Sequence, residues 1–242
     1  MSVPALNLLG GVELTGVAPA LADRLLAQAK VVGFLAYLAL APAGRYQRRD
    51  RLVGLLWPEL DQSHARAALR KAVHATRATF GEDAIVGRGD EELLLPTEGV
   101  ACDVRLFRDD INAGRLAAAL DRYHGELMPG FHLAGCVEFG SWLDGERASV
   151  TQRASAAAWT LAIQLEATSD LSRAGQLARR AVTYEWSDER VLRRTMQMLH
   201  RIGDRAGAIK VFEGCARRMR AELETEPSAE TVALATTLRA AK

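Results

Sequence analysis

A segment in the second half of the chain repeats after 34 residues. The stretch "DLSRAGQLARRA" begins at Asp170, and "DRAGAIKVFEGCA" begins at Asp204. This offset aligns Ala174 with Ala208, so a small residue recurs at the same position of each copy. Stacked helical units repeat with periods of this size, and small residues let their two helices cross closely. The repeat therefore predicts that this half of the chain folds as stacked helix pairs.

The repeat length is that of tetratricopeptide helix pairs. The agreement is partial, because the proline that ends such a repeat is Ser187 in one copy and is displaced to Pro227 in the other. Beyond residue 100 the pattern is helical and lacks strand signals. We therefore expect residues 101–242 to form an all-α, tetratricopeptide-like domain.

The first 100 residues mix short strands with short helices. The stretch "LNLLGGVELTG" predicts a strand, a turn and a second strand. Residues 29–41 are almost entirely apolar and predict a buried helix that ends before Pro42. A second helix has Leu52, Leu55 and Leu56 at helical spacing and stops at Pro58. Asp61 and Ser63 are candidate N-caps of the helix that follows.

That third helix, residues 64–80, is basic. At about 100° per residue, its apolar residues share one face, and several cations fall in an arc of about 80° beside it. Residues 44–80 hold eight Arg or Lys against three acids, whereas residues 81–100 hold one Arg against six acids. The predicted core face consists of Leu69, Ala72, Val73, Thr76 and Phe80. Such a local positive block in a chain of net charge +1 indicates an anionic partner at one surface.

The stretch "AIVGRGDEELLLP" follows and predicts a β-hairpin, with strands at residues 85–86 and 93–95. Two short helices, a basic helix and a hairpin in this order make a winged helix-turn-helix. Its third helix would enter the major groove and its wing would lie along the DNA backbone. Arginine supplies both contacts to guanine edges and contacts to phosphates. The candidate DNA-binding residues are Arg66, Arg70, Lys71, His74 and Arg77 of the basic helix, with Arg48 and Arg49 before it and Arg88 in the hairpin.

The whole chain resembles the Streptomyces antibiotic regulatory protein (SARP) family. Residues 52–81, "LVGLLWPELDQSHARAALRKAVHATRATFG", followed by a hairpin, are similar to the DNA-binding domain of that family, a winged helix of the response-regulator type. The matching residues are Leu52, Leu56, Trp57, Pro58, Ala65, Arg66, Leu69, Arg70, Val73, Arg77 and Gly81. The motifs "CDVRLF", "YHGELMPGF", "WLDGER", "GDRAGAI" and "EPSAET", between residues 102 and 231, resemble the bacterial transcriptional activation domain that follows it.

The resemblance implies a mainly α protein with a small β component. A winged helix-turn-helix at residues 1–100 would precede a tetratricopeptide-like activation domain at residues 101–242. It further implies a transcriptional activator that binds double-stranded promoter DNA, often as a homodimer on direct repeats, and recruits RNA polymerase holoenzyme. The family also includes longer proteins, so the chain is either a small member or the N-terminal part of a longer regulator.

A second basic helix is predicted at residues 189–202, "ERVLRRTMQMLHRI". Its apolar side should pack in the repeat core. Its arginines, Arg190, Arg193, Arg194 and Arg201, fall within about 100° of one another. One interpretation is a surface that meets an acidic face of RNA polymerase or of a second protomer. The other is a solvated face, or ion pairs with neighbours such as Glu185 and Asp188.

The sequence contains no motif typical of a metal-binding protein, a nucleotide-binding protein or an enzyme. The five histidines and three cysteines lack metal-ligand spacing, no phosphate-binding loop is present, and no nucleophile has a plausible base partner. We therefore expect no catalytic residue, no metal and no cofactor. The longest apolar run is about half of a membrane span, and unpaired cysteines suit a reducing cytoplasm. The alternatives are a helical-repeat adaptor or ligand-sensing module without specific DNA binding and, less favoured, an enzyme.

Overall fold

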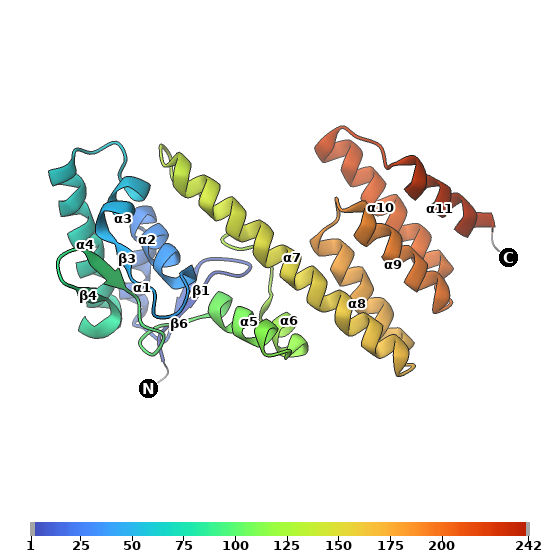
Figure 1. The fold of residues 1–242 in the computed structure, drawn as a ribbon, viewed down its shortest axis with the longest axis horizontal. Coiled ribbons are helices and arrows are strands. Elements are labelled where there is room, and N and C mark those ends of the chain that lie inside the picture. The colour runs from blue at the N-terminus through green and yellow to red at the C-terminus, as the bar shows by residue number, and fades with distance from the viewer. Residues whose placement is uncertain (1–2, 241–242) are drawn as a thin grey trace. The chain divides into compact units, whose positions relative to one another are not determined.

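The computed structural model describes residues 3–240 (Figure 1) and divides into two compact units. Unit 1 consists of residues 1–113 with residues 121–150, and unit 2 consists of residues 114–120 with residues 151–242. The mainly helical fold with small sheets confirms the predicted fold class. Within the described residues, no helix is long and apolar enough to span a membrane.

The first sheet of unit 1 joins the start of the chain to residues just past position 100. Strands β1 (Ala5–Asn7) and β2 (Glu13–Thr15) pair antiparallel, as predicted. Strand β6 (Ala101–Cys102) pairs parallel to β1, and this corrects the expectation that no strand follows residue 100. The Asp103 carboxylate accepts the backbone N–H groups of Leu8 and Leu9 at 2.8–3.0 Å, which fixes the new helix start to the end of β1.

Three helices precede the basic helix, and the sequence predicted only two of them. The predicted pair is α2 (Ala29–Leu40) and α3 (Arg49–Leu56), and the basic helix is α4 (Gln62–Phe80). The additional helix is α1 (Pro19–Leu26), which begins with a proline at its first position and contacts both α2 and α4. A short 3-10 helix, η1 (Glu82–Ala84), then leads into the wing.

The wing is a three-stranded antiparallel sheet. Its hairpin consists of β4 (Val86–Arg88) and β5 (Glu92–Leu94), which confirms the predicted hairpin. The third strand, β3 (Gln47–Arg48), lies just before α3 and pairs with β5, so the strand order is β3-β5-β4. Because β3 ties the wing to the start of α3, the wing has a fixed base within the helix-turn-helix.

The helices α5 (Asp103–Asn112), α6 (Leu116–Arg122) and α7 (Val137–Ala167) follow the wing. The first part of α7 packs on α2. A Cβ added at Gly33 would lie 3.2 Å from the Phe139 ring, and the rings of Tyr37 and Trp142 are 4.8 Å apart. Residues 137–150 of α7 therefore complete the core of the first compact unit, while a functional boundary near residue 100 stays a prediction.

Arginines of α5 bind the C-terminal end of α2. The Arg105 guanidinium donates to the carbonyl oxygens of Leu38 and Ala39, and Arg108 donates to that of Leu40. The last carbonyls of a helix have no partner within the helix, and cations are favourable beside them. These two side chains therefore both satisfy and electrostatically stabilise the end of α2.

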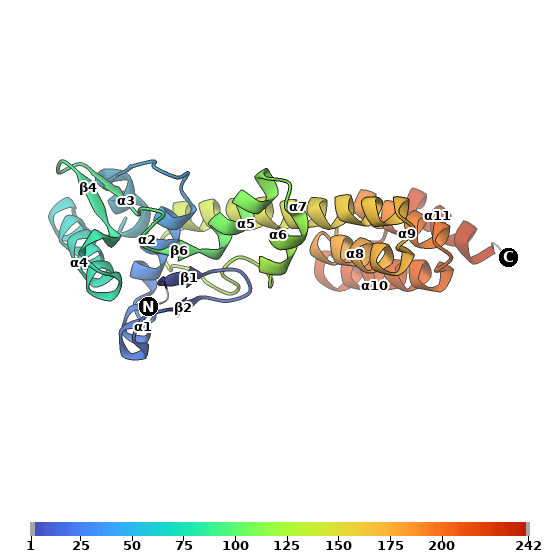
Figure 2. The same cartoon turned by 90° about the horizontal axis from the view of Figure 1, so that it is seen from below.

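Unit 2 contains the predicted repeat. It includes α8 (Leu171–Tyr184), α9 (Glu189–Arg201), α10 (Arg205–Leu223) and α11 (Ala229–Ala240), and α9 contacts each of the other three (Figures 1 and 2). The two repeat starts are alike, because Asp170 caps α8 and Asp204 caps α10. The aligned alanines, Ala174 and Ala208, are fully buried where the helices cross.

Candidate nucleic-acid interface

The basic helix α4 has well-defined ends. Its N-cap is Asp61, whose carboxylate accepts the backbone N–H groups of Ser63 and His64 at 2.9 and 3.1 Å. The bond from the His64 backbone, together with the His64 side chain, lowers the pKa of Asp61 to about 2. At the other end Gly81 has φ +104°, a conformation that favours glycine, and it stops the helix. The cations of α4 are thus carried on a helix with fixed limits.

One face of α4 anchors it to unit 1. Leu69, Ala72 and Thr76 have at most 1% of their surface exposed, and Val73 is also buried. These residues belong to the predicted core face, and Phe80, the last of that set, is half-buried. Because this face is packed, the orientation of the opposite, cationic face is set by the core.

Three basic residues of α4 are exposed and carry no ion pair. Arg70, Lys71 and His74 are all exposed. Among the described residues, the ion pairs of α4 engage His64, Arg66 and Arg77 instead. Exposed, unpaired cations in a row on one helix are what a phosphate-bearing partner requires.

The other two arginines of the predicted arc bind groups of the protein itself. Arg66 forms an ion pair with Asp50 of α3 at 3.0 Å. Arg77 is half-buried, and its guanidinium donates to the Ile85 carbonyl oxygen at 2.7 Å. Arg77 therefore joins α4 to the base of the wing by a hydrogen bond. The sequence showed no acid within one turn of these arginines, and it could not show partners from other elements.

The candidate cations outside α4 also have local partners. Arg48 is exposed and lies 3.9 Å from the Asp50 carboxylate. Arg49 is half-buried, and its backbone N–H donates to the Glu91 carbonyl oxygen in the wing. Arg88 pairs with Glu92 and lies 4.5 Å from the centre of the Tyr46 ring. Of these three, Arg48 is the one whose geometry best suits a contact to phosphate.

The acidic tip of the wing lies near the arginines. A cavity of about 310 Å³ is lined by Arg49, Arg66 and Arg70 together with Asp90 and Glu91 of the tip. No ion pair joins the two sets within the described residues, since Arg66 engages Asp50 instead. The tip carboxylates therefore lower the local positive potential without neutralising a particular side chain.

The second basic helix, α9, buries the predicted apolar side. Val191, Leu192, Thr195, Met196, Met198 and Leu199 are buried, and Ile202 is half-buried against the same core. On its other side Arg190 pairs with Asp188 at 3.1 Å, and Arg201 pairs with Glu166 at 2.9 Å. The bond to Glu166 raises the pKa of Arg201.

The two central arginines of α9 are bound more deeply. Arg193 donates to the Thr231 hydroxyl at 2.9 Å and pairs with Glu230 of α11 at 3.1 Å. Arg194 lies 4.5 Å from the centre of the Trp159 ring, and burial lowers its pKa. Ion pairs with neighbouring acids, the other interpretation of this helix, thus engage Arg190, Arg193 and Arg201. Arg190 is the most exposed of these three, with 84% of its side chain accessible, and a partner-facing role of the arc stays a prediction.

Arg24, a cation near α4, was not among the site residues predicted from the sequence. Arg24 lies on α1 and lines a cavity together with Arg70 and Lys71. Two features of the sequence could have indicated helix α1: the proline at its first position, and the apolar residues Leu21 and Leu25 at helical spacing. Within residues 3–240, no cluster of His, Cys, Asp and Glu could hold a metal ion.

In chain order, a winged helix with an exposed basic helix precedes a helical repeat, the arrangement that the sequence predicted. The family of the chain follows from its second part, because residues 106–239 match the bacterial transcriptional activator domain. That match covers more than half of the sequence, so the chain belongs to this family, in agreement with the resemblance to SARP regulators.

A solved structure has the same fold. The structure titled Mycobacterium tuberculosis EmbR in complex with low affinity phosphopeptide matches with a TM-score of 0.62 at 16% identity. The match covers 99% of this chain and 65% of EmbR, so the chain spans about two thirds of the length of that protein. Comparison with curated protein sequences finds no significant match.

Proposed function

We propose that the protein activates transcription by binding promoter DNA through α4 and recruiting RNA polymerase holoenzyme. The observation that carries the proposal is the row of exposed, unpaired basic side chains Arg70, Lys71 and His74 on a helix fixed by its buried face. In a winged helix, the corresponding helix enters the major groove. The activator-domain family supports the transcriptional half of the proposal.

The roles within the site differ. Arg70 and Lys71 would make the main contacts, with His74 beside them, and Arg48 would reach a phosphate. Arg66 would contribute only after leaving Asp50, and Arg77, Arg49 and Arg88 would hold the shape of the wing. Two copies on direct repeats would double the contact area on DNA, and the site of action would be the cytoplasm.

The polymerase contact has one preferred residue among the predicted four. Arg190 has 84% of its side chain exposed and its acidic partner, Asp188, is its near neighbour in the chain, whereas Arg193, Arg194 and Arg201 contact side chains of other helices. A contact with an acidic surface of the polymerase would therefore centre on Arg190. In vitro transcription with Arg190→Glu, alongside a gel-shift assay, separates this contact from DNA binding.

The test of DNA binding uses the double variant Arg70→Ala with Lys71→Ala. Affinity for DNA from upstream of the gene should fall roughly 10- to 100-fold, and the dependence of log affinity on log salt should become shallower by about two. Arg217→Ala, which removes an exposed arginine of α10, is the matched control and should change neither. Equal affinity of the double variant and wild type across the salt series would overturn the assignment and favour the adaptor alternative.

A further inference from the structure

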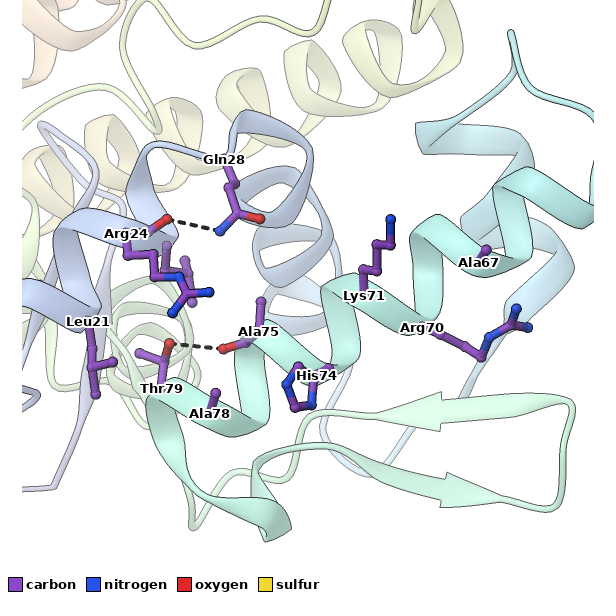
Figure 3. Close-up of a pocket in the computed structure, with 11 residues that line it drawn as sticks. Leu21, Arg24, Gln28, Ala67, Arg70, Lys71, His74, Ala75, Ala78 and Thr79 are labelled. Atoms are coloured by element: carbon purple, nitrogen blue, oxygen red, sulfur yellow. Dashed lines mark hydrogen bonds between the residues drawn. The ribbon is translucent and has the colours of Figure 1, made fainter.

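A cavity of about 560 Å³ lies between α1 and α4 (Figure 3). Its size is within the range of roughly 300–1,000 Å³ found for small-molecule sites. Its wall is mostly apolar and comes from both helices. The apolar lining residues are Leu21, Leu25, Ala67, Ala75 and Ala78.

The ionisable side chains around this cavity are all basic. Arg24 comes from α1, and Arg70, Lys71 and His74 come from α4. No carboxylate is among the lining residues, and the other two polar side chains are satisfied locally. The Gln28 amide donates to the Arg24 carbonyl oxygen at 2.9 Å, and the Thr79 hydroxyl donates to that of Ala75 at 2.9 Å, as Figure 3 shows. The cationic groups therefore keep their capacity to bind an external anion.

Apolar walls and unpaired cations together favour one kind of ligand. DNA phosphate alone would use the cations but would leave the apolar wall uncovered. A neutral apolar molecule would cover the wall but would not use the cations. A compact molecule that joins an apolar body to an anionic group satisfies both, because each part meets its own surface.

We propose that this cavity binds a small amphipathic anion, an apolar body bearing a carboxylate, sulfonate or phosphate, and that this binding competes with DNA. The competition half rests on the proposed function, because the ligand would engage Arg70, Lys71 and His74 of the DNA-binding helix. A ligand seated on these groups neutralises the helix and places its body beside it. The site thereby couples a metabolite of this class to the release of DNA.

The first arm of the test locates the site without DNA. The probe is 8-anilino-1-naphthalenesulfonate, followed by its fluorescence, and its uncharged partner is N-phenyl-1-naphthylamine, which has the same apolar body. Wild-type protein should bind the sulfonate saturably, one per chain, and at least fivefold more tightly than the uncharged probe. Arg24→Gln should weaken sulfonate binding roughly tenfold, as expected for loss of one charge-assisted contact.

Two further variants make this arm specific. Ala78→Phe fills the cavity from an exposed position of α4 and should abolish saturable binding. Arg217→Gln removes an exposed arginine of α10 and should leave binding unchanged. Unchanged sulfonate affinity in both Arg24→Gln and Ala78→Phe would overturn the site, and equal affinity for the two probes would overturn its preference for anions.

The second arm measures competition. Sulfonate at saturating concentration should weaken binding of wild-type protein to promoter DNA at least fivefold, and it should have little effect on DNA binding by Arg24→Gln. DNA binding unaffected by bound sulfonate would overturn the coupling. If the protein binds no DNA at all, the proposed function fails, while the fluorescence arm still decides whether the ligand site exists.

Discussion

The two basic helices α4 and α9 share a pattern of apolar and basic residues but have different surroundings. Each begins at an aspartate N-cap, buries one apolar face and places several cations on the other. On α4, Arg70 and Lys71 remain exposed without an ion pair within the described residues. On α9, Arg193 and Arg201 each meet a glutamate from another helix.

The difference lies in what other segments bring to each helix. Helix α9 meets Glu166 of α7, Glu230 of α11 and the Trp159 ring. Helix α4 meets Asp50 of α3 and Glu82 of η1, and among the described residues these engage Arg66 and Arg77 but leave Arg70 and Lys71 unpaired. Helix periodicity shows which residues share a face, but it does not show what faces them. A cationic arc is therefore a binding surface only where the tertiary structure leaves it unpaired.

The largest expected effect is on the stability of the protein, and it differs between substitutions on the two helices. Arg193→Glu would place a carboxylate beside Glu189 and Glu230 and remove the hydrogen bond that Arg193 donates to the Thr231 hydroxyl, so the free energy of unfolding should fall by about 3 kcal/mol. Arg70→Glu, at an exposed site, should change it by less than about 0.5 kcal/mol. Urea denaturation of both variants measures the difference. Equal stabilities would mean that the α9 contacts contribute nothing.

A smaller effect on stability is expected from loss of the aspartate N-cap that the two helices share. Asp61→Ala and Asp188→Ala each remove an N-cap, and each should lower the melting temperature by a few degrees. The pKa of Asp61 falls from 3.8 to about 2 on folding, so its contribution is complete above pH 3.8 and is lost as the pH falls toward 2. Melting curves between pH 2 and pH 6 check this. A penalty for Asp61→Ala that persists at pH 2 would contradict the role of the ionised carboxylate.

The smallest effect concerns acids near α4 that form no pair with it. Asp90→Asn with Glu91→Gln removes two negative charges from the tip of the wing, so DNA affinity should rise a few-fold at low salt and little at high salt. Gel-shift titrations at two salt concentrations measure the change. Glu213→Gln, on α10 of unit 2, serves as the control for loss of an acid. An unchanged affinity at low salt would show that the wing tip stays away from DNA.

Much of the fold was predictable because its signals are local. The apolar run of α2, the cap and glycine of α4, the hairpin and the 34-residue repeat all lie in contiguous stretches. The missed elements depend on distant partners. Strand β6 has two residues and exists through pairing with β1, and β3 exists through pairing with β5.

The candidate site was predictable only in part, for the same reason. Exposure of Arg70, Lys71 and His74 follows from the apolar face of α4. The capture of Arg66 by Asp50 and of Arg77 by the Ile85 carbonyl oxygen depends on how α3 and the wing pack against that helix. Arg24 reaches the same surface from α1, which the sequence analysis did not identify.

The binding of the α2 end by Arg105 and Arg108 has a consequence for synthesis on the ribosome. The carbonyl oxygens of residues 38–40 emerge long before the guanidinium groups that satisfy them, and the rings that cover α2 come later still, at Phe139 and Trp142. At a synthesis rate of roughly 5–20 residues per second, this interval lasts on the order of ten seconds. The nascent winged helix therefore lacks part of the cover of α2 during this interval, and it can reach its final form only after the first part of α7 has been translated.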